Sequence, residues 1–324
     1  MTIKVRDYEV RLTRNKEERR MVRNLRYDVF VAEEGASATP EQHALREEYD
    51  DYDTHADYMA VFHNGRVVGT YRIIGRDAAE KMGGFYTETE FNISKIKKSP
   101  ANIAEMSRAC VAREYRENAL VMRMLWAGLG EYVVRRKIVI VFGVASWVGK
   151  NPGLAAQAIS YLYYNNLSPA SLRATVLPER FAPGVNPKLS RMNILPREFV
   201  DEDAARREMP PLIKGYLRLG ASFGRGVFVD GPFNTYDVFV MLQVKNIDAA
   251  YKKHFLGRAT ALDGIDDGEG RDGVIKTIGK IVLSPVTVPL KMAGAVFEFL
   301  LREDAADAEF IEDADDNNTT GMGA

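Results

Sequence analysis

The chain has little cysteine, little histidine and almost no net charge. Its one cysteine, Cys110, excludes a framework of internal disulfides and suits a reducing compartment. The four histidines lack the spacing of paired metal ligands, so no metal is expected. The 44 Lys and Arg residues balance 45 Asp and Glu residues, and this net charge of −1 gives no indication of a nucleic-acid partner.

Long uninterrupted hydrophobic runs are also missing. Residues 1–4 lack the apolar core of a signal peptide, and we therefore expect a cytoplasmic protein. Residues 274–301 are strongly apolar, but Pro285 and Pro289 leave them too broken for a spanning helix of about 20 residues. Two amphipathic helices within 273–302 are expected either to lie on the inner face of the cytoplasmic membrane or to pack on protein.

The rest of the composition fits one large domain followed by a tail. A length of 324 residues with 46% hydrophobic content is enough to bury a large core. We expect this domain over residues 1–256, with 151–256 as its C-terminal half. A polar, glycine-rich linker is expected over 257–272 and an acidic, disordered tail over 303–324.

Hydrophobic periodicity predicts alternating strands and helices. Strands are expected at residues 9–12, 59–62, 66–74, around 105–111, and at 137–145, 226–229 and 237–244. Helices are expected at residues 16–30, from 120 onward, and at 154–164 and 212–219. Asn64-Gly65 predicts a tight hairpin turn. This order predicts an α/β (α+β) fold, in which helices flank a mixed central sheet, with a C-terminal apolar helical extension.

The predicted strand around Glu105 carries the clearest functional signal. Glu105 and Arg108 lie among apolar residues, where burial shifts pKa values. Glu105 is the candidate general base, because an apolar setting raises the pKa of a carboxyl group. The alternative is a Glu105–Arg108 salt bridge, which requires a bulge because these residues point to opposite faces of a strand. Cys110 is expected to be a buried, inert thiol.

A helix start is expected just after this strand, with Asn118 as its N-cap. The free backbone N–H groups at such a start, with Arg113 and Arg116 beside them, predict a site for a phosphate group. The alternative is that this arginine-rich turn is only a solvated connection.

Four motifs occur together in a characteristic order. They are Arg26 to Phe30, Glu48 to Asp53, Gly69 to Arg72 and Glu105 to Arg108. In this order they resemble the acyl-chain branch of the GNAT superfamily, which includes ornithine-lipid N-acyltransferases and acyl-homoserine-lactone synthases.

Further stretches are similar to the ornithine-lipid group within this branch. The blocks at residues 84–91, 214–221 and 230–238 look like that group. Residues 33–36 stand where the lactone synthases usually carry a tryptophan. The resemblance covers roughly residues 8–256 and departs at Tyr236, where a small hydroxyl residue is typical.

The resemblance implies a GNAT fold and an N-acyltransferase activity. The reaction it implies moves a 3-hydroxy fatty acyl chain from acyl carrier protein to the α-amino group of an amino acid, with ornithine expected first, forming lyso-ornithine lipid. Glu105 and Arg108 would be the catalytic residues. The acceptor site would be formed by Arg26, Asp50, Asp53 and Arg72. The alternative for this acceptor cluster is an ion-pair network that only fixes the N-terminal helix.

The donor is expected to be a carrier protein rather than free coenzyme A. GNAT enzymes that use coenzyme A usually carry a loop whose glycines let the backbone approach the pyrophosphate, and Arg116 and Asn118 hold those positions here. We therefore expect no cofactor besides the phosphopantetheine thioester of the donor. The basic surface for the carrier protein would comprise Arg113, Arg116, Arg123, Arg135, Arg136, Lys137 and Lys150. The alternatives are a signal synthase that uses S-adenosylmethionine and a non-catalytic acyl-binding or carrier-protein-binding module.

Overall fold

The structure is a computed structural model that describes residues 2–117 and 119–247. In this part of the chain the strands are β1 (Thr2–Val5), β2 (Tyr8–Leu12), β3 (Asp57–His63), β4 (Arg66–Gly75), β5 (Phe91–Asn92), β6 (Ile103–Val111), β7 (Ile140–Val148), β8 (Thr175–Val176), β9 (Ser222–Asp230) and β10 (Thr235–Gln243). They form one mixed sheet in the order β1-β2-β3-β4-β6-β7-β10-β9-β8-β5. The β6–β7 and β8–β9 pairs are parallel and the other pairs are antiparallel.

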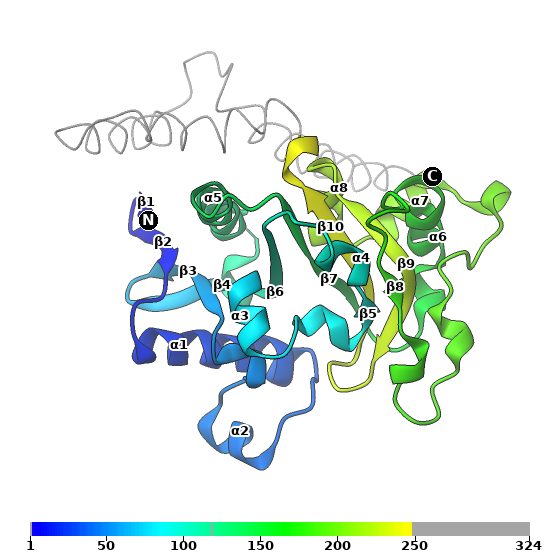
Figure 1. Cartoon of the computed structure of the whole chain (residues 1–324). Helices are drawn as coiled ribbons and strands as arrows, with labels where there is room; N and C mark the ends of the chain where they lie inside the picture. Colours follow the sequence, from blue (N-terminus) through cyan, green and yellow to red (C-terminus); the bar gives the residue numbers. More distant parts are fainter. Residues whose placement is uncertain (1, 118, 248–324) are drawn as a thin grey trace, which may run out of the picture. The chain divides into compact units, whose positions relative to one another are not determined.

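Helices cover both faces of this sheet. They are α1 (Lys16–Arg26), α2 (Pro40–Leu45), α3 (Arg76–Lys81), α4 (Ser94–Lys97), α5 (Leu120–Arg135), α6 (Ala156–Asn165), α7 (Glu202–Glu208) and α8 (Pro211–Arg218). Val22 of α1 packs with Tyr58 of β3, whereas Leu125 of α5 packs with Met59, the next residue along the same strand. Because successive strand residues point to opposite faces, α1 and α5 lie on opposite sides of the sheet (Figure 1).

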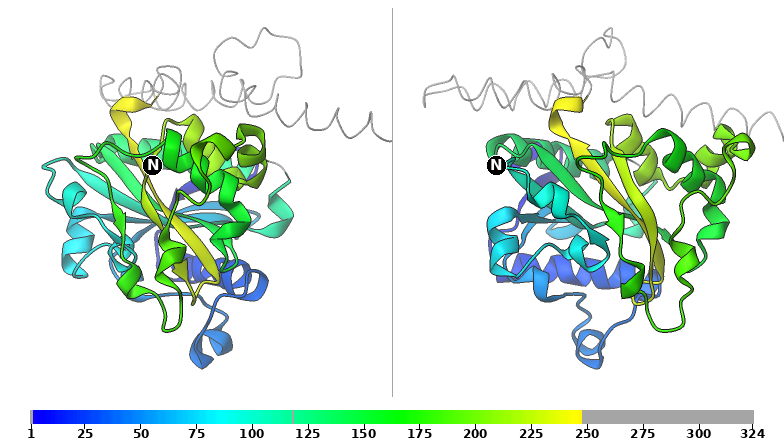
Figure 2. Two further views of the ribbon diagram at one scale, coloured as in Figure 1. Left: turned by 90° about the vertical axis from the view of Figure 1, so that its right-hand side faces the viewer. Right: turned by 45° about the vertical axis from the view of Figure 1, so that its right-hand side comes forward.

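The second half of the sheet continues these two layers. Tyr216 of α8 lies 3.1 Å, oxygen to oxygen, from Tyr71, which packs under α5, so α8 lies on the α5 face. Figure 2 shows the green helical segments gathered beside the yellow β9–β10 hairpin. On the α1 face, Phe91 and Ile96 pack against Phe142 of β7. The predicted α/β architecture with helices on both faces is therefore confirmed.

Local predictions are confirmed in part. The 64–65 hairpin forms as expected, with Asn64 at φ 50° and Gly65 at φ 75°, the left-handed region in which Asn and Gly are favoured. The helix predicted over 16–30 is shorter, because α1 ends at Arg26 and the chain continues as a π-helix, Tyr27–Glu33.

All described residues belong to one compact unit, Met1–Asp248. Among them, no helix is both long enough and apolar enough to cross a membrane. The expected domain end at 256, the linker 257–272, the apolar segment 273–302 and the tail 303–324 lie outside the described residues.

Candidate active site

Three arginines and three acidic residues gather on the α1 face. This set, called the charged network below, consists of Arg26, Glu48, Asp50, Asp53, Arg72 and Arg108. Asp53 Oδ1 lies 2.8 Å from Arg26 Nη1 and 3.1 Å from Arg72 Nη1. Asp50 Oδ2 lies 2.9 Å from Arg108 Nη2. The structure thus brings the four predicted acceptor residues together and adds Glu48 and Arg108.

Most of the charged network is closed to solvent. The side chains of Arg26 and Arg72 are 0% exposed, whereas that of Asp50 is 24% exposed. Burial raises the pKa of Asp53, but Arg26 and Arg72 outweigh burial and hold that pKa below its ordinary range. The buried part fixes the end of α1 to the sheet, and Asp50 is the most exposed member of the network.

A β-bulge in β6 directs Arg108 into this network. Between β4 and β6, Thr70 pairs with Cys110 and Arg72 with Ser107, so a two-residue step on β4 faces a three-residue step on β6. Arg108 takes a positive φ of 51° at the bulge. The bulge that a Glu105–Arg108 pair requires is therefore present, but the Arg108 guanidinium pairs with Asp50 and Glu48 instead.

Glu105 is a fully buried carboxylate with one free oxygen. Its Oε2 accepts a hydrogen bond from the Thr87 backbone N–H at 2.8 Å, while its Oε1 is buried with no hydrogen-bond partner. Burial raises the pKa of Glu105, and the charge of Arg72 and the bond from Thr87 oppose part of that rise. A carboxylate with a raised pKa and an unused oxygen is suited to accept a proton.

Glu105 marks the point where β6 and β7 separate. Pairs between these parallel strands run from Ile103 with Ile140 to Glu105 with Phe142, and in the described part of the chain they extend no further. At Gly143 an added Cβ would lie 2.3 Å from the Met106 carbonyl oxygen, so only glycine permits this close approach. Beyond it, the β7-facing backbone edge of β6 is left without a strand partner.

The predicted donor residues lie at the carboxyl end of β6. Arg113 is exposed. Arg116 is paired with Glu33, Nη2 to Oε2 at 2.9 Å, and its Nε donates to the Val111 carbonyl. Asn118 lies outside the described residues. Its prediction as N-cap was wrong, because α5 starts at Leu120 with Ala119 at the N-cap position and no side-chain cap.

The Cys110 thiol is 5% exposed on the α1 face. Burial raises the pKa of this thiol above its ordinary range, which disfavours the reactive thiolate. The prediction of a buried thiol is confirmed.

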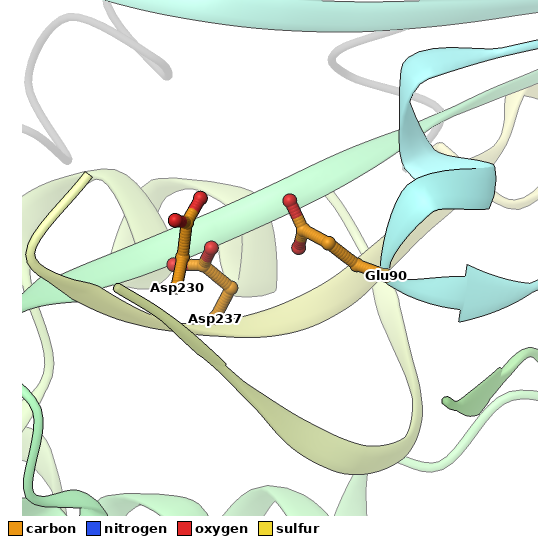
Figure 3. A group of neighbouring side chains, drawn as sticks. All are labelled: Glu90, Asp230 and Asp237. Carbon is orange, nitrogen blue, oxygen red and sulfur yellow. The ribbon is translucent and has the colours of Figure 1, made fainter. Parts of the chain in front are cut away.

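A second acidic cluster, which the sequence reasoning missed, lies on the same face. Glu90, Asp230 and Asp237, called the carboxylate triad below, each place one oxygen within 4.8 Å of the others, and all three are buried (Figure 3). The spacing of the histidines gives no indication of this cluster, because no histidine belongs to it. The signal was nevertheless present, because the triad falls in two of the blocks, 84–91 and 230–238, on which the family resemblance rests.

Arg108 lies between the charged network and the carboxylate triad. Its guanidinium carbon lies 4.4 Å from the centre of the Tyr86 ring and 4.1 Å from that of Phe233. Both aromatic residues are partly exposed, and both flank the triad in sequence. The two acidic clusters therefore share one arginine and one aromatic wall.

Comparisons with known proteins identify the family of the chain. The acetyltransferase (GNAT) domain family matches residues 25–127. An L-ornithine N(alpha)-acyltransferase of Rhodobacter capsulatus is 34% identical, over 78% of this chain and 95% of that protein. Its counterpart in Agrobacterium fabrum is 35% identical, over 79% of this chain and 87% of that protein.

Two solved structures are similar to parts of this chain at low identity. FeeM, an N-acyl amino acid synthase from uncultured soil microbes, is 14% identical with a TM-score of 0.41, over 74% of this chain and 91% of that one. The CoA-dependent acyl-homoserine lactone synthase BjaI is 15% identical with a TM-score of 0.42, over 76% of this chain and 83% of that one. The chain matches these named relatives over most of their length. It is therefore an acyltransferase and belongs to the L-ornithine N(alpha)-acyltransferase family of the GNAT superfamily.

Proposed function

We propose that the chain transfers a 3-hydroxy fatty acyl group from the phosphopantetheine thioester of acyl carrier protein to the α-amino group of L-ornithine. The product is lyso-ornithine lipid. The observation that carries the proposal is Glu105, a buried carboxylate with a free oxygen at the point where β6 and β7 separate. The names of the relatives support ornithine as the acceptor.

In this reaction Glu105 is the general base. The neutral amine nitrogen attacks the thioester carbonyl carbon, the C–N bond forms, and the C–S bond then breaks. The amine proton passes to Glu105, directly or through a water, and the pantetheine thiolate leaves and takes up a proton. Backbone groups on the unpaired edge of β6 hold the pantetheine arm and stabilise the carbonyl oxygen as charge develops there. No covalent enzyme intermediate is needed.

Acyl carrier protein docks at the carboxyl ends of β6 and β7. Arg113 follows β6 and Lys150 follows β7, and because the two strands are parallel these residues lie at the same edge of the sheet. Arg135, Arg136 and Lys137 instead lie at the far end of α5, which at 16 residues is about 24 Å long. The basic surface expected from the sequence is therefore divided between the two ends of α5.

A competition assay tests this function. The purified full-length chain is incubated with 3-hydroxyacyl carrier protein and an equimolar mixture of ornithine, lysine, glutamine and glycine, and the N-acylated products are identified by mass spectrometry. The expected main product is acyl-ornithine. A different acyl-amino acid as the main product would support N-acyl transfer but show that ornithine is not the preferred acceptor. Turnover only with S-adenosylmethionine would indicate a signal synthase, and no turnover at all would indicate a binding module.

A further inference from the structure

The carboxylate triad is assembled from three separate places in the fold. Glu90 follows the short 3-10 turn Tyr86–Thr89, Asp230 ends β9, and Asp237 lies in β10. The neighbours of Asp237 on β10, Tyr236 and Val238, pack on the α5 face, so Asp237 points to the opposite face, as Glu105 does. Figure 3 shows the three carboxyl groups directed toward a common space.

Glu90 has no ion-pair partner among the described residues. The Tyr86 side chain stabilises its charged form, but both Glu90 oxygens and Asp237 Oδ1 are buried without a partner at ordinary hydrogen-bond distance. By contrast, Asp230 Oδ1 accepts a hydrogen bond from the Phe233 backbone N–H at 3.0 Å. A buried carboxylate that is left unpaired is costly, so an unpaired Glu90 directed at two aspartates indicates a site that receives a cation.

The surrounding charges compensate the triad only in part. The charged network balances itself, with three arginines against three carboxylates. Arg108 acts on all three members of the triad, but Asp50 and Glu48 already engage its guanidinium. Burial and mutual repulsion raise the pKa values of Glu90 and Asp237, that of Asp237 to about 7, whereas burial is the main cause of the rise at Asp230.

We propose that the carboxylate triad binds the side-chain ammonium group of the amino-acid acceptor and thereby selects a diamino acid. This inference rests on the proposed function, which supplies an acceptor with a second amine. An ammonium group has three N–H donors, and with N–O distances of about 2.8 Å the accepting oxygens lie about 4.6 Å apart. The triad offers three oxygens that all lie within 4.8 Å of one another.

The triad and Glu105 are linked through one short turn. Thr87, whose backbone N–H holds Glu105, and Glu90 stand three residues apart at the same short turn. The α-amine then lies near Glu105 while the side-chain ammonium enters the triad. Arg108, which lies between the charged network and the triad, receives the α-carboxylate.

A divalent metal ion is the competing occupant of these oxygens. Hard cations such as Mg²⁺ and Ca²⁺ take six or more oxygen ligands, and water supplies those that the protein does not. Asp237 also bonds to Ser146 and Thr235 through its side chain, and Asp230 is held by Phe233, which leaves few oxygens to complete such a shell.

Comparison of ornithine with norvaline tests the proposal, because norvaline has the same carbon chain without the second amine. For the wild type we expect a higher kcat/KM with ornithine than with norvaline. Asp237→Asn and Glu90→Gln should each lower kcat/KM for ornithine by roughly tenfold or more and leave the norvaline value unchanged. Glu47→Gln is the matched control, because Glu47 is a buried glutamate paired with Arg20 and Arg23 away from the triad. This control should leave the ratio of kcat/KM for ornithine to kcat/KM for norvaline unchanged.

The change in melting temperature on adding each amino acid measures binding, so it tests the proposal even if a variant loses its activity. Ornithine should raise the melting temperature of the wild type more than norvaline does, and Asp237→Asn should abolish that difference. Equal use of both acceptors by the wild type, or equal loss of both in the variants, would overturn the inference while leaving acyl transfer intact. A stoichiometric metal ion in the purified wild type that is lost in Asp237→Asn would also overturn it. Failure of the wild type to acylate any amino acid would instead contradict the proposed function.

Discussion

At the scale of single residues, the environment of Glu105 sets its chemistry. Its neighbours on β6, Ala104 and Met106, pack on the α5 face, so the alternation of the strand turns Glu105 toward the charged side of the sheet. There it is buried beside Arg72 and accepts one hydrogen bond. Burial raises its pKa more than these contacts lower it, so the carboxyl group titrates closer to neutral pH than an exposed glutamate.

Glu105→Gln should lower kcat by about 10²–10⁴-fold, because glutamine cannot accept the amine proton. In the wild type, the acidic limb of the pH profile of kcat/KM should lie above the ordinary glutamate pKa of about 4.3. That limb should be absent in Glu105→Gln. Steady-state rates across pH check this prediction, with circular dichroism as the control for folding. A variant that retains both its rate and its acidic limb would exclude Glu105 as the base.

Asp237→Asn should stabilise the ligand-free protein at alkaline pH. Burial and the charge of Asp230 raise the folded-state pKa of Asp237 to about 7, and the opposing charge of Arg108 only reduces this rise. An aspartate in the unfolded chain titrates at about 3.9. The folded state therefore binds the extra proton, and stability that is complete below pH about 4 is lost as pH rises through about 7.

The free energy of unfolding measures this effect. Between pH 5 and pH 8 the wild type should lose roughly 2–3 kcal/mol through Asp237, and Asp237→Asn should not. Urea denaturation at the two pH values provides the comparison, with Glu47→Gln as the control. An identical pH dependence in wild type and Asp237→Asn would show that Asp237 is already ionised in the folded protein at pH 5.

At the scale of elements, the separation of β6 from β7 creates the donor edge. Gly143 allows β7 to approach the Met106 carbonyl, and the two strands stop pairing just there. Gly143→Ala should destabilise the protein by about 1–3 kcal/mol, because its Cβ meets backbone rather than a movable side chain. Gly75→Ala is the control, since no atom lies within 4 Å of its added Cβ. Equal melting temperatures for the two variants would contradict this account.

The direction of α5 separates its two basic ends. Arg113→Glu and Lys150→Glu should lower kcat/KM for acyl carrier protein donors by roughly tenfold and leave a short acyl-pantetheine donor unaffected, because only the protein donor presents an acidic surface. Arg135→Glu and Lys137→Glu, at the other end of α5, should change neither value. Comparison of the two donors checks this. A loss at the 135–137 end alone would place the docking surface there.

At the scale of the whole molecule, regular periodicity was readable in the sequence and long-range assembly was not. The Asn64-Gly65 hairpin and the strand around Glu105 formed as predicted, because each depends on local backbone preference or side-chain alternation. The π-helix after Arg26 and the short helices α2, α3, α4 and α7 carried no such periodic signal.

The candidate site shows the same division. Four of the six members of the charged network were predicted from motifs, but the partner of Arg108 depends on a bulge that the sequence does not reveal. The carboxylate triad unites Glu90 with Asp230 and Asp237 across about 140 residues of chain, and only the fold brings them together. The Asn118 cap was predicted from residue type, and the helix began two residues later.

The most direct test of the account is the identity of the acylated nitrogen in a single-turnover reaction. Wild type and Glu105→Gln are each mixed with 3-hydroxyacyl carrier protein and ornithine labelled with ¹⁵N at the α position, and the product is fragmented by mass spectrometry while released thiol is measured. The account predicts one thiol released for each acyl group that becomes bonded to the labelled nitrogen, at a rate greatly reduced in Glu105→Gln. Acylation of the side-chain nitrogen, or equal rates for the two proteins, would contradict it.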